Sequence, residues 1–185
     1  MNSKERKRYI NKVKRFAKSK TGLAKIKQIC PQLAEVIINS PELLNIHQYK
    51  NDPRTSGNYI NSIYDKTFYT GQSGNVFLRE AEHIYNFLTD ASYYGGIYKK
   101  GTKACFKIFA VGVEDINMRL FIEEKVIKKF EPVLQYTSEE ADEYGKDKPL
   151  LENHSREEVP VDTCVHVHLR IERFKKIEEE FFNNN

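Results

Sequence analysis

The chain has 185 residues, a net charge of +4 and a composition that is 39% hydrophobic and 12% aromatic. This apolar content is enough for a folded core and excludes wholesale disorder, and the length suits one domain with extensions. The three cysteines are far apart, which argues against a disulfide framework or a zinc knuckle and favours a reducing, cytoplasmic location.

Positive charge is concentrated near the N-terminus. Residues 1–27 contain eleven Lys and Arg and a single Glu, whereas residues 138–185 contain seven Lys and Arg against thirteen Asp and Glu. A basic block of this kind is typical of a surface that binds a polyanion, because neutralised phosphates release counterions. We expect neither a secretory signal nor a membrane span, since the block has no apolar stretch and no run of about 18 apolar residues occurs.

The first part of the chain is expected to be helical. Apolar residues at helical spacing among lysines and arginines predict a basic amphipathic helix over residues 4–18. A second helical stretch over residues 22–39 contains Pro31, where we expect a break, and residues 40–42 restart a short helical turn. Turn residues at 51–53 end this helical extension.

A β-hairpin and a helix are predicted next. Residues 59–64 and 67–70 are rich in β-branched and aromatic residues and predict two strands joined by a turn. After a loop from Gly71 to Asn75, apolar spacing predicts a helix over residues 75–89. Its core stripe consists of Phe77, Ala81, Ile84 and Leu88, and its opposite face of Arg79, His83 and Asn86.

The remaining elements complete an α/β (α+β) fold. Residues 104–113 predict a buried strand, and residues 116–130 predict a helix capped by Asp115. An acidic loop over residues 138–158 and a strand over residues 161–171, with a short helix after it, follow. We therefore expect a small, mainly antiparallel sheet flanked by helices, with three segments: a basic helical extension (1–52), a central domain (53–137) and an acidic, mixed extension (138–185).

An ordered set of polar residues runs through the central domain. Gly57-Asn58-Tyr59 and Tyr69-Thr70-Gly71 place two tyrosines ten residues apart. Arg79 and His83 follow, one turn apart on a helix face, and Glu123 lies on a later helix. A phenol pair, a cation, an imidazole and a carboxylate are the groups needed to cleave a phosphodiester bond with one metal ion.

This set resembles the GIY-YIG nuclease family over about residues 57–135. The literal Gly96-Ile97-Tyr98 has no matching tripeptide downstream, so we do not assign it to the motif. The resemblance implies a stand-alone, metal-dependent DNA endonuclease. Restriction-type cleavage is the first expectation, and a mobile-element or repair nuclease and an inactive DNA-binding member of the same fold are the alternatives. A homodimer is left open.

The resemblance also implies a role for each residue. Tyr59 and Tyr69 would lie side by side on neighbouring strands, where one of them orients or deprotonates the attacking water. Arg79 would clamp the scissile phosphate, with His83 one turn further along. Glu123 would hold a single Mg²⁺ or Mn²⁺ together with phosphate oxygens and waters.

Glu123 is preferred over its neighbour Glu124 on physical grounds. Glu123 lies within the apolar stripe of its helix, and Glu124 falls to one side. A carboxylate on the apolar side is costly unless a cation or hydrogen bonds compensate, so it is the residue that requires a partner. The stripe consists of Ile116, Leu120 and Ile127.

The motif departs from the family pattern in its supporting positions. Asn58, between Gly57 and Tyr59, and Thr70, between Tyr69 and Gly71, stand where the family usually has isoleucine. The other departures are Gln72, where many members have a lysine that could assist water activation, and Gln135, where an asparagine is common.

Two other features have competing interpretations. The basic N-terminal helix is expected to contact DNA or to pack on the central domain, and an anionic membrane surface or an acidic partner is the alternative. The row Cys164, His166 and His168 on one strand face suggests a metal site, but we find no fourth ligand and favour a plain polar face. The expected DNA-binding residues are Lys4, Arg6, Lys7, Arg8, Lys12, Lys14 and Arg15.

Overall fold

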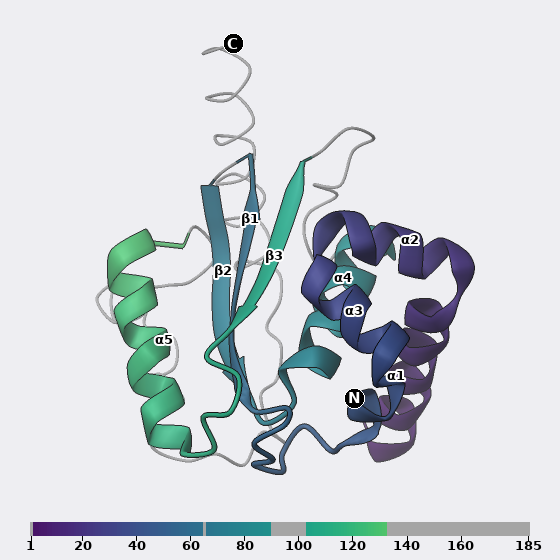
Figure 1. The fold of residues 1–185 in the computed structure, drawn as a ribbon, viewed down its shortest axis with the longest axis horizontal. Helices are drawn as coiled ribbons and strands as arrows, with labels where there is room; N and C mark the ends of the chain where they lie inside the picture. The colour runs from purple at the N-terminus through teal and green to yellow at the C-terminus, as the bar shows by residue number, and fades with distance from the viewer. Residues whose placement is uncertain (1, 65, 90–102, 133–185) are drawn as a thin grey trace.

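The structure, a computed structural model, describes residues 2–64, 66–89 and 103–132 (Figure 1). The elements within these residues are α1 (Ser3–Lys18), α2 (Lys20–Ile29), α3 (Pro31–Asn39), the 3₁₀ helix η1 (Pro41–Asn45), β1 (Gly57–Ile63), β2 (Lys66–Ser73), α4 (Val76–Thr89), β3 (Ala104–Phe109) and α5 (Ile116–Phe130).

The N-terminal helices begin and end where local chemistry predicts. Asn2 and Glu5 form a reciprocal capping box at the start of α1, with hydrogen bonds of 2.8 and 3.0 Å. Ser19 ends α1, and its hydroxyl accepts a hydrogen bond from the amide of Gly22 and so caps α2. Pro31 is the first residue of α3, which confirms the predicted break between two helices.

The sheet has the strand order β2-β1-β3, with both pairs antiparallel. The predicted hairpin is confirmed, but the predicted loop from Gly71 is wrong: β2 continues through Ser73, and Gly71 pairs with Tyr59. Strand β3 is shorter than predicted and ends at Phe109. Ala110, the next residue, has a φ of 50°, outside the β region, and leaves the sheet.

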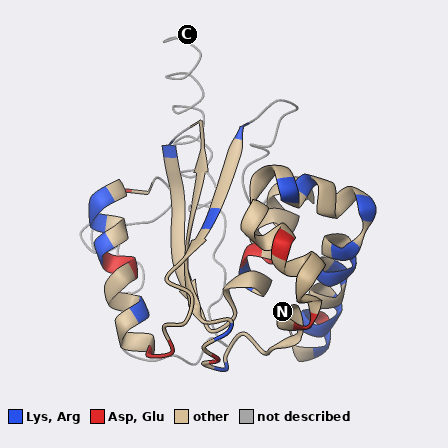
Figure 2. Ribbon diagram, viewed as in Figure 1, with Lys and Arg blue, Asp and Glu red and all other residues tan. Residues whose placement is uncertain are grey.

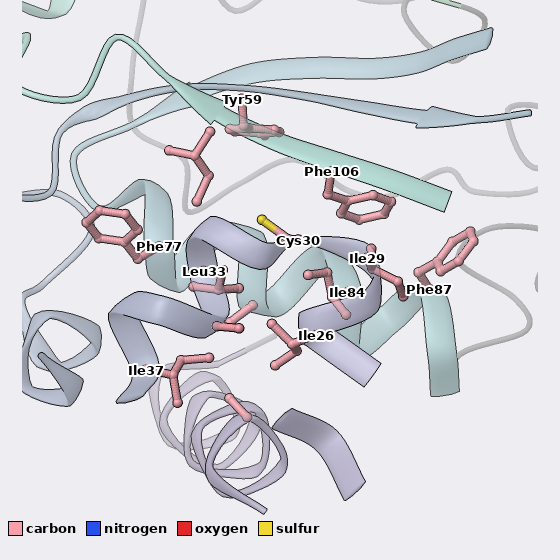
Figure 3. Close-up of a cluster of buried hydrophobic side chains, with 14 of the residues drawn as sticks. Ile26, Ile29, Cys30, Leu33, Ile37, Tyr59, Phe77, Ile84, Phe87 and Phe106 are labelled. Carbon is pink, nitrogen blue, oxygen red and sulfur yellow. The ribbon is translucent and has the colours of Figure 1, made fainter. Parts of the chain in front are cut away.

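Helices cover both faces of the sheet. Helix α4 lies against one face together with α2 and α3, which contact β3, and α1 packs on α2 and α4, whereas α5 lies alone on the other face (Figure 1). Residues from the N-terminal helices, α4 and the sheet share one hydrophobic core. Figure 3 shows this core, in which Leu33 and Ile26 of the N-terminal helices, Ile84 of α4 and Phe106 of β3 are completely or almost completely buried.

Helix α4 is buried on nearly all sides. Its predicted core stripe is confirmed, since Phe77, Ala81 and Ile84 are buried against the sheet and the other helices. The opposite face is covered as well: His83 contacts Tyr59 of β1, and the Tyr9 hydroxyl of α1 donates a hydrogen bond to Asn86 at 2.8 Å. Apolar periodicity predicts one buried face, and the sheet and α1 together cover the other.

The predicted fold class is confirmed: a small antiparallel sheet flanked by helices. The start of α5 is also as predicted, with Asp115 accepting a hydrogen bond from Asn117 at its N-terminus. Within the described part of the chain, every helix is too short or too polar to cross a bilayer. The Gly96-Ile97-Tyr98 tripeptide, Gln135, the acidic loop, the predicted strand over 161–171 and the row Cys164, His166 and His168 lie outside the described residues.

Candidate active site

Two predicted site residues meet through a hydrogen bond. The hydroxyl of Tyr59 on β1 lies 3.0 Å from Nε2 of His83 on α4, and each residue is only 2% exposed. This contact places Tyr59 on the face of β1 that α4 covers. Asn58 and Ile60, its neighbours along the strand, therefore lie on the other face. The sequence spacing alone placed the two residues in one set, and the structure brings their polar atoms into contact.

Tyr69 completes a cluster of three rings. It lies on β2 opposite Asn61 of β1, and Asn61 is two residues after Tyr59 on the same face. Its ring centroid is 6.1 Å from that of Tyr59 and 5.2 Å from that of His83. Tyr69 is half-buried, unlike the other two rings, so its side chain is the one that solvent can reach.

Gly71 makes room for the phenol of Tyr59. These residues are directly paired in the β1–β2 ladder. A Cβ at position 71 would lie 2.3 Å from the Tyr59 hydroxyl oxygen and 2.5 Å from the ring carbon that bears it, closer than van der Waals contact permits. Position 71 must therefore be glycine for a steric reason: only a residue without a Cβ lets the Tyr59 ring lie across β2.

Arg79 stands beside this cluster and is held by an acidic residue. Its Nη1 donates to Oε2 of Glu82 at 3.2 Å, one turn further along α4. The Arg79 side chain is 28% exposed, whereas that of Glu82 is only 2% exposed. Arg79 forms a hydrogen bond with Tyr59, and its positive charge lowers the pKa of both Tyr59 and His83, so its guanidinium lies close to both rings.

The protonation states of the buried pair follow from this environment. Burial raises the pKa of Tyr59 well above its ordinary value, and nearby Tyr69 adds to the rise, while the charge and a hydrogen bond of Arg79 oppose it. Burial lowers the pKa of His83 well below its ordinary value, and the positive charge of Arg79 acts in the same direction. At neutral pH the pair is therefore a protonated phenol against a neutral imidazole.

A buried carboxyl lies next to the cluster and was missed by the sequence analysis. Glu80 is completely buried, and the amide of Asn61, in the orientation that satisfies both of its ends, donates to Glu80 Oε1 at 2.9 Å. Burial raises the pKa of Glu80 well above its ordinary value, although the charge of Arg79 and the hydrogen bond from Asn61 lower it. Its position, three residues after Phe77 and four before Ile84, is the same pattern that singled out Glu123.

Glu123 lies on α5, on the other side of the sheet from the tyrosine–histidine cluster (Figure 1). It is half-buried, whereas its neighbour Glu124 is exposed and pairs with Lys128 at 2.6 Å. This difference agrees with the reasoning that preferred Glu123. The structure thus brings Tyr59, Tyr69, His83 and Arg79 together, and it places Glu123 on a separate helix that packs on β1 and β2.

Two of the residues that depart from the family pattern, Asn58 and Gln72, lie on the α5 face of the sheet, where both bind Arg119. These residues are paired across β1 and β2. Asn58 donates to the backbone oxygen of Arg119 at 3.0 Å, and Gln72 accepts from its Nε at 3.1 Å. Arg119 is only 1% exposed and also donates to Asn51 and to the carbonyl oxygens of residues 113 and 114. The substitutions at positions 58 and 72 therefore hold a buried arginine that joins α5 to the sheet.

The predicted DNA-binding residues lie along α1, where Figure 2 shows many Lys and Arg on the side of the helical layer away from the sheet. Two of them have side-chain partners in other elements, and Arg15 donates to the backbone oxygen of Asn11 within α1 at 3.4 Å. Arg6 pairs with Glu82 at 2.6 Å, and the Lys14 ammonium donates to Asn45 at 3.0 Å. The others are exposed: Lys4, Lys7, Arg8, Lys12 and Arg15.

Within residues 2–64, 66–89 and 103–132, no three His, Cys, Asp or Glu side chains are grouped closely enough to hold a metal by themselves. A scan against protein-family models and searches of curated proteins and of solved structures each found no match to this chain. The functional assignment therefore depends on the geometry of the chain's own residues.

Proposed function

We propose that this protein is a metal-dependent DNA endonuclease that hydrolyses phosphodiester bonds. The observation that supports this most strongly is the convergence of Tyr59, Tyr69, His83 and Arg79 from two strands and a helix. These side chains come from separate parts of the chain and include a hydroxyl that solvent can reach, a neutral base and a cation. Such a combination suits a reaction that moves a proton beside a phosphate.

In this proposal the two tyrosines have different tasks. Tyr69 is half-buried, so its hydroxyl orients the attacking water. Tyr59 stays protonated because of its raised pKa, so it acts as a hydrogen-bonding support and not as the base. His83, neutral and 3.0 Å from the Tyr59 hydroxyl, would accept the hydrogen bond that holds Tyr59 in place, and the proton of the attacking water would pass to the solvent that reaches Tyr69.

Arg79 is the phosphate clamp in this proposal. A guanidinium presents five N–H donors in a plane, and its pair with Glu82 uses only part of that capacity. The partial exposure of its side chain lets a phosphate approach it from solvent. Charge that develops on the phosphoryl oxygens would be offset by this fixed positive group.

The residue that would hold a metal ion is Glu123. Mg²⁺ binds hard oxygen ligands and is commonly held by one or two carboxylates together with waters and substrate phosphates, so the half-buried Glu123 carboxylate suits it. When bound, such an ion would neutralise charge on the phosphate and its leaving oxygen. The alternative of a metal held only by protein side chains has less support, because the described residues offer no acidic or histidine cluster.

DNA would be held by the exposed cations of α1 through its phosphate backbone. Lys4, Lys7, Arg8, Lys12 and Arg15 lie on one helix and are free of carboxylate partners on neighbouring turns other than Glu5. Contacts of this kind supply affinity without sequence information and weaken steeply with salt. Restriction-type cleavage is the first biological role that we propose, with mobile-element and repair roles as competitors.

One observation favours a second candidate, a DNA-binding module without turnover. Tyr59 and His83 are each 2% exposed, which is the burial of core residues and not of groups that meet a substrate. In such a module the cluster would stabilise the fold, and Arg79 and α1 would bind the phosphate backbone.

The discriminating experiment is incubation of the purified chain with supercoiled plasmid and Mg²⁺ or Mn²⁺. An endonuclease converts the plasmid to nicked or linear forms, and sequencing of the ends locates the cut. Arg79→Ala and Glu123→Ala should each slow cleavage by about 100-fold or more, because each removes charge stabilisation in the transition state. Intact plasmid with the wild-type chain in both metals, together with retained DNA binding, would favour the binding module.

A further inference from the structure

Glu82 joins the N-terminal basic helix to the proposed phosphate clamp. Its Oε1 accepts from Nη2 of Arg6 on α1 at 2.6 Å, and its Oε2 accepts from Nη1 of Arg79 at 3.2 Å. Arg6 and Arg79 are far apart in the chain, and both side chains are just over one-quarter exposed, whereas that of Glu82 is 2% exposed. The result is a chain of three charged groups that runs from α1 to the tyrosine–histidine cluster.

Other contacts hold α1 against α4 in the position that brings Arg6 to Glu82. The Tyr9 hydroxyl donates to Asn86 of α4 at 2.8 Å, and the rings of Tyr9 and Phe16 pack edge-to-face on Tyr85. Val13 of α1 is completely buried. These contacts fix α1 against α4, so Arg6 is held at Glu82 by packing as well as by charge.

The presence of Arg6 changes the net charge around Arg79, the proposed phosphate clamp. A buried carboxylate needs compensation, and Glu82 would take it all from Arg79 if Arg6 were absent. Arg79 and Glu82 alone form a neutral pair, which attracts a phosphate weakly. With Arg6 the group of three has a net charge of +1, and Glu82 Oε1 takes its hydrogen bond from Arg6 and not from Arg79.

We propose that Arg6 and Glu82 are positioning residues of the active site, and that α1 is part of the phosphate-binding machinery in addition to being a DNA contact. This inference rests on the proposed function of Arg79 as phosphate clamp. Glu82 orients the Arg79 guanidinium, and Arg6 keeps the clamp positively charged. Neither residue touches the reacting atoms.

The test compares four variants of the full chain by steady-state cleavage at several DNA concentrations. Arg6→Ala should lower kcat by about tenfold, since it acts through Arg79 and not on the phosphate itself. Lys18→Ala is the matched control: it removes one positive charge from an exposed position of the same helix, and its kcat should remain within about twofold of wild type. Arg6→Lys retains a cation for Glu82 and should recover most of kcat.

The double variant Arg6→Ala with Glu82→Gln separates positioning from simple stability. It removes the charges of Arg6 and Glu82 and leaves the clamp with the +1 charge of Arg79 alone. We expect kcat above that of Arg6→Ala, although the double variant loses more native contacts. Equal or lower kcat in the double variant, or equal kcat in Arg6→Ala and Lys18→Ala, would overturn the inference.

A second measurement does not depend on cleavage. Inorganic phosphate is titrated into the ¹⁵N-labelled chain while the side-chain Nε–Hε signal of Arg79, assigned with Arg79→Lys, is followed by NMR. Phosphate should shift this signal in wild type and Lys18→Ala, much less in Arg6→Ala, and again in the double variant. If wild type cleaves no DNA but the signals behave in this way, the endonuclease proposal fails and the positioning inference stands. The same response in Arg6→Ala as in wild type would overturn the inference.

Discussion

The phenol of Tyr59 lies across Gly71 on the neighbouring strand, so closely that a single methyl group at position 71 would collide with the hydroxyl oxygen at 2.3 Å. This relationship links the two tripeptides physically. The first supplies the ring, and the second supplies the gap in which the ring lies. Because the ring carbon would also be only 2.5 Å away, a small rotation of the hydroxyl cannot relieve the collision.

Gly71→Ala should therefore destabilise the fold and displace Tyr59 from His83. Overpacking of this kind costs about 1–3 kcal/mol of unfolding free energy, which denaturant titration measures. In a Tyr59→Ala background the same substitution should cost much less, since the obstructing ring is gone. An equal cost in both backgrounds would show that the ring is not the cause.

Removal of Arg119 should destabilise the junction between α5 and the sheet. Arg119→Ala removes the buried side chain that donates to Asn51, Gln72 and the 113–114 carbonyls, and we expect a loss of about 2–3 kcal/mol. The control is Arg54→Ala, which breaks an exposed pair with Asp52 and should cost no more than about 1 kcal/mol. Similar losses in the two variants would contradict the role given to Arg119.

Glu80→Gln should stabilise the protein increasingly as the pH rises. The raised pKa of Glu80 means that the folded chain holds a proton there, whereas the unfolded chain releases it above its ordinary pKa. Wild-type stability is thus lost as pH rises from about 4.3 toward the raised folded value, at up to about 1.4 kcal/mol per pH unit. Glutamine needs no proton and can still accept from Asn61. The measurement is the difference in unfolding free energy between variant and wild type at several pH values; a difference that does not change with pH would contradict the assignment.

The two tyrosine hydroxyls should contribute differently to cleavage. Tyr69→Phe removes the half-buried hydroxyl and should lower kcat by about 100-fold if it orients the water. Tyr59→Phe should have a smaller effect on kcat, because the Tyr59 hydroxyl acts through His83. Tyr59→Phe should instead change the dependence of kcat on pH. In wild type the lowered pKa of His83 places the acid limb of this profile below the ordinary histidine value of about 6.5. Equal losses with identical profiles would argue against separate tasks.

Local chemistry explains which parts of the fold could be predicted. The cap at Asp115 and the break at Pro31 depend on residues close in sequence, and the structure has both where they were predicted. The extent of β2 could not be predicted in the same way. Gly71 disfavours a strand on its own, and only the ring of Tyr59 on the other strand explains its presence there.

The candidate site was predictable in part for the same reason. Ordered spacing selected Tyr59, Tyr69, Arg79 and His83, and these side chains do meet. The ion pairs and buried acids around them depend on how α1 packs on α4, which the periodicity of either helix does not reveal. Glu82 and Arg119 appeared to be ordinary polar helix residues, because their partners lie tens of residues away. The position of Glu123 relative to the cluster depends likewise on the packing of α5.

The metal-dependent proposal requires the cluster and Glu123, which lie on opposite sides of the sheet, to act on one phosphate. The most direct measurement is a crystal structure of the Glu123→Gln variant with uncleaved DNA and Mg²⁺. We predict a backbone phosphate about 3 Å from the Arg79 guanidinium and from the Tyr69 hydroxyl, with residue 123 facing the same phosphate. DNA bound only along α1, with no phosphate near Arg79 and residue 123 facing another surface, would contradict the account.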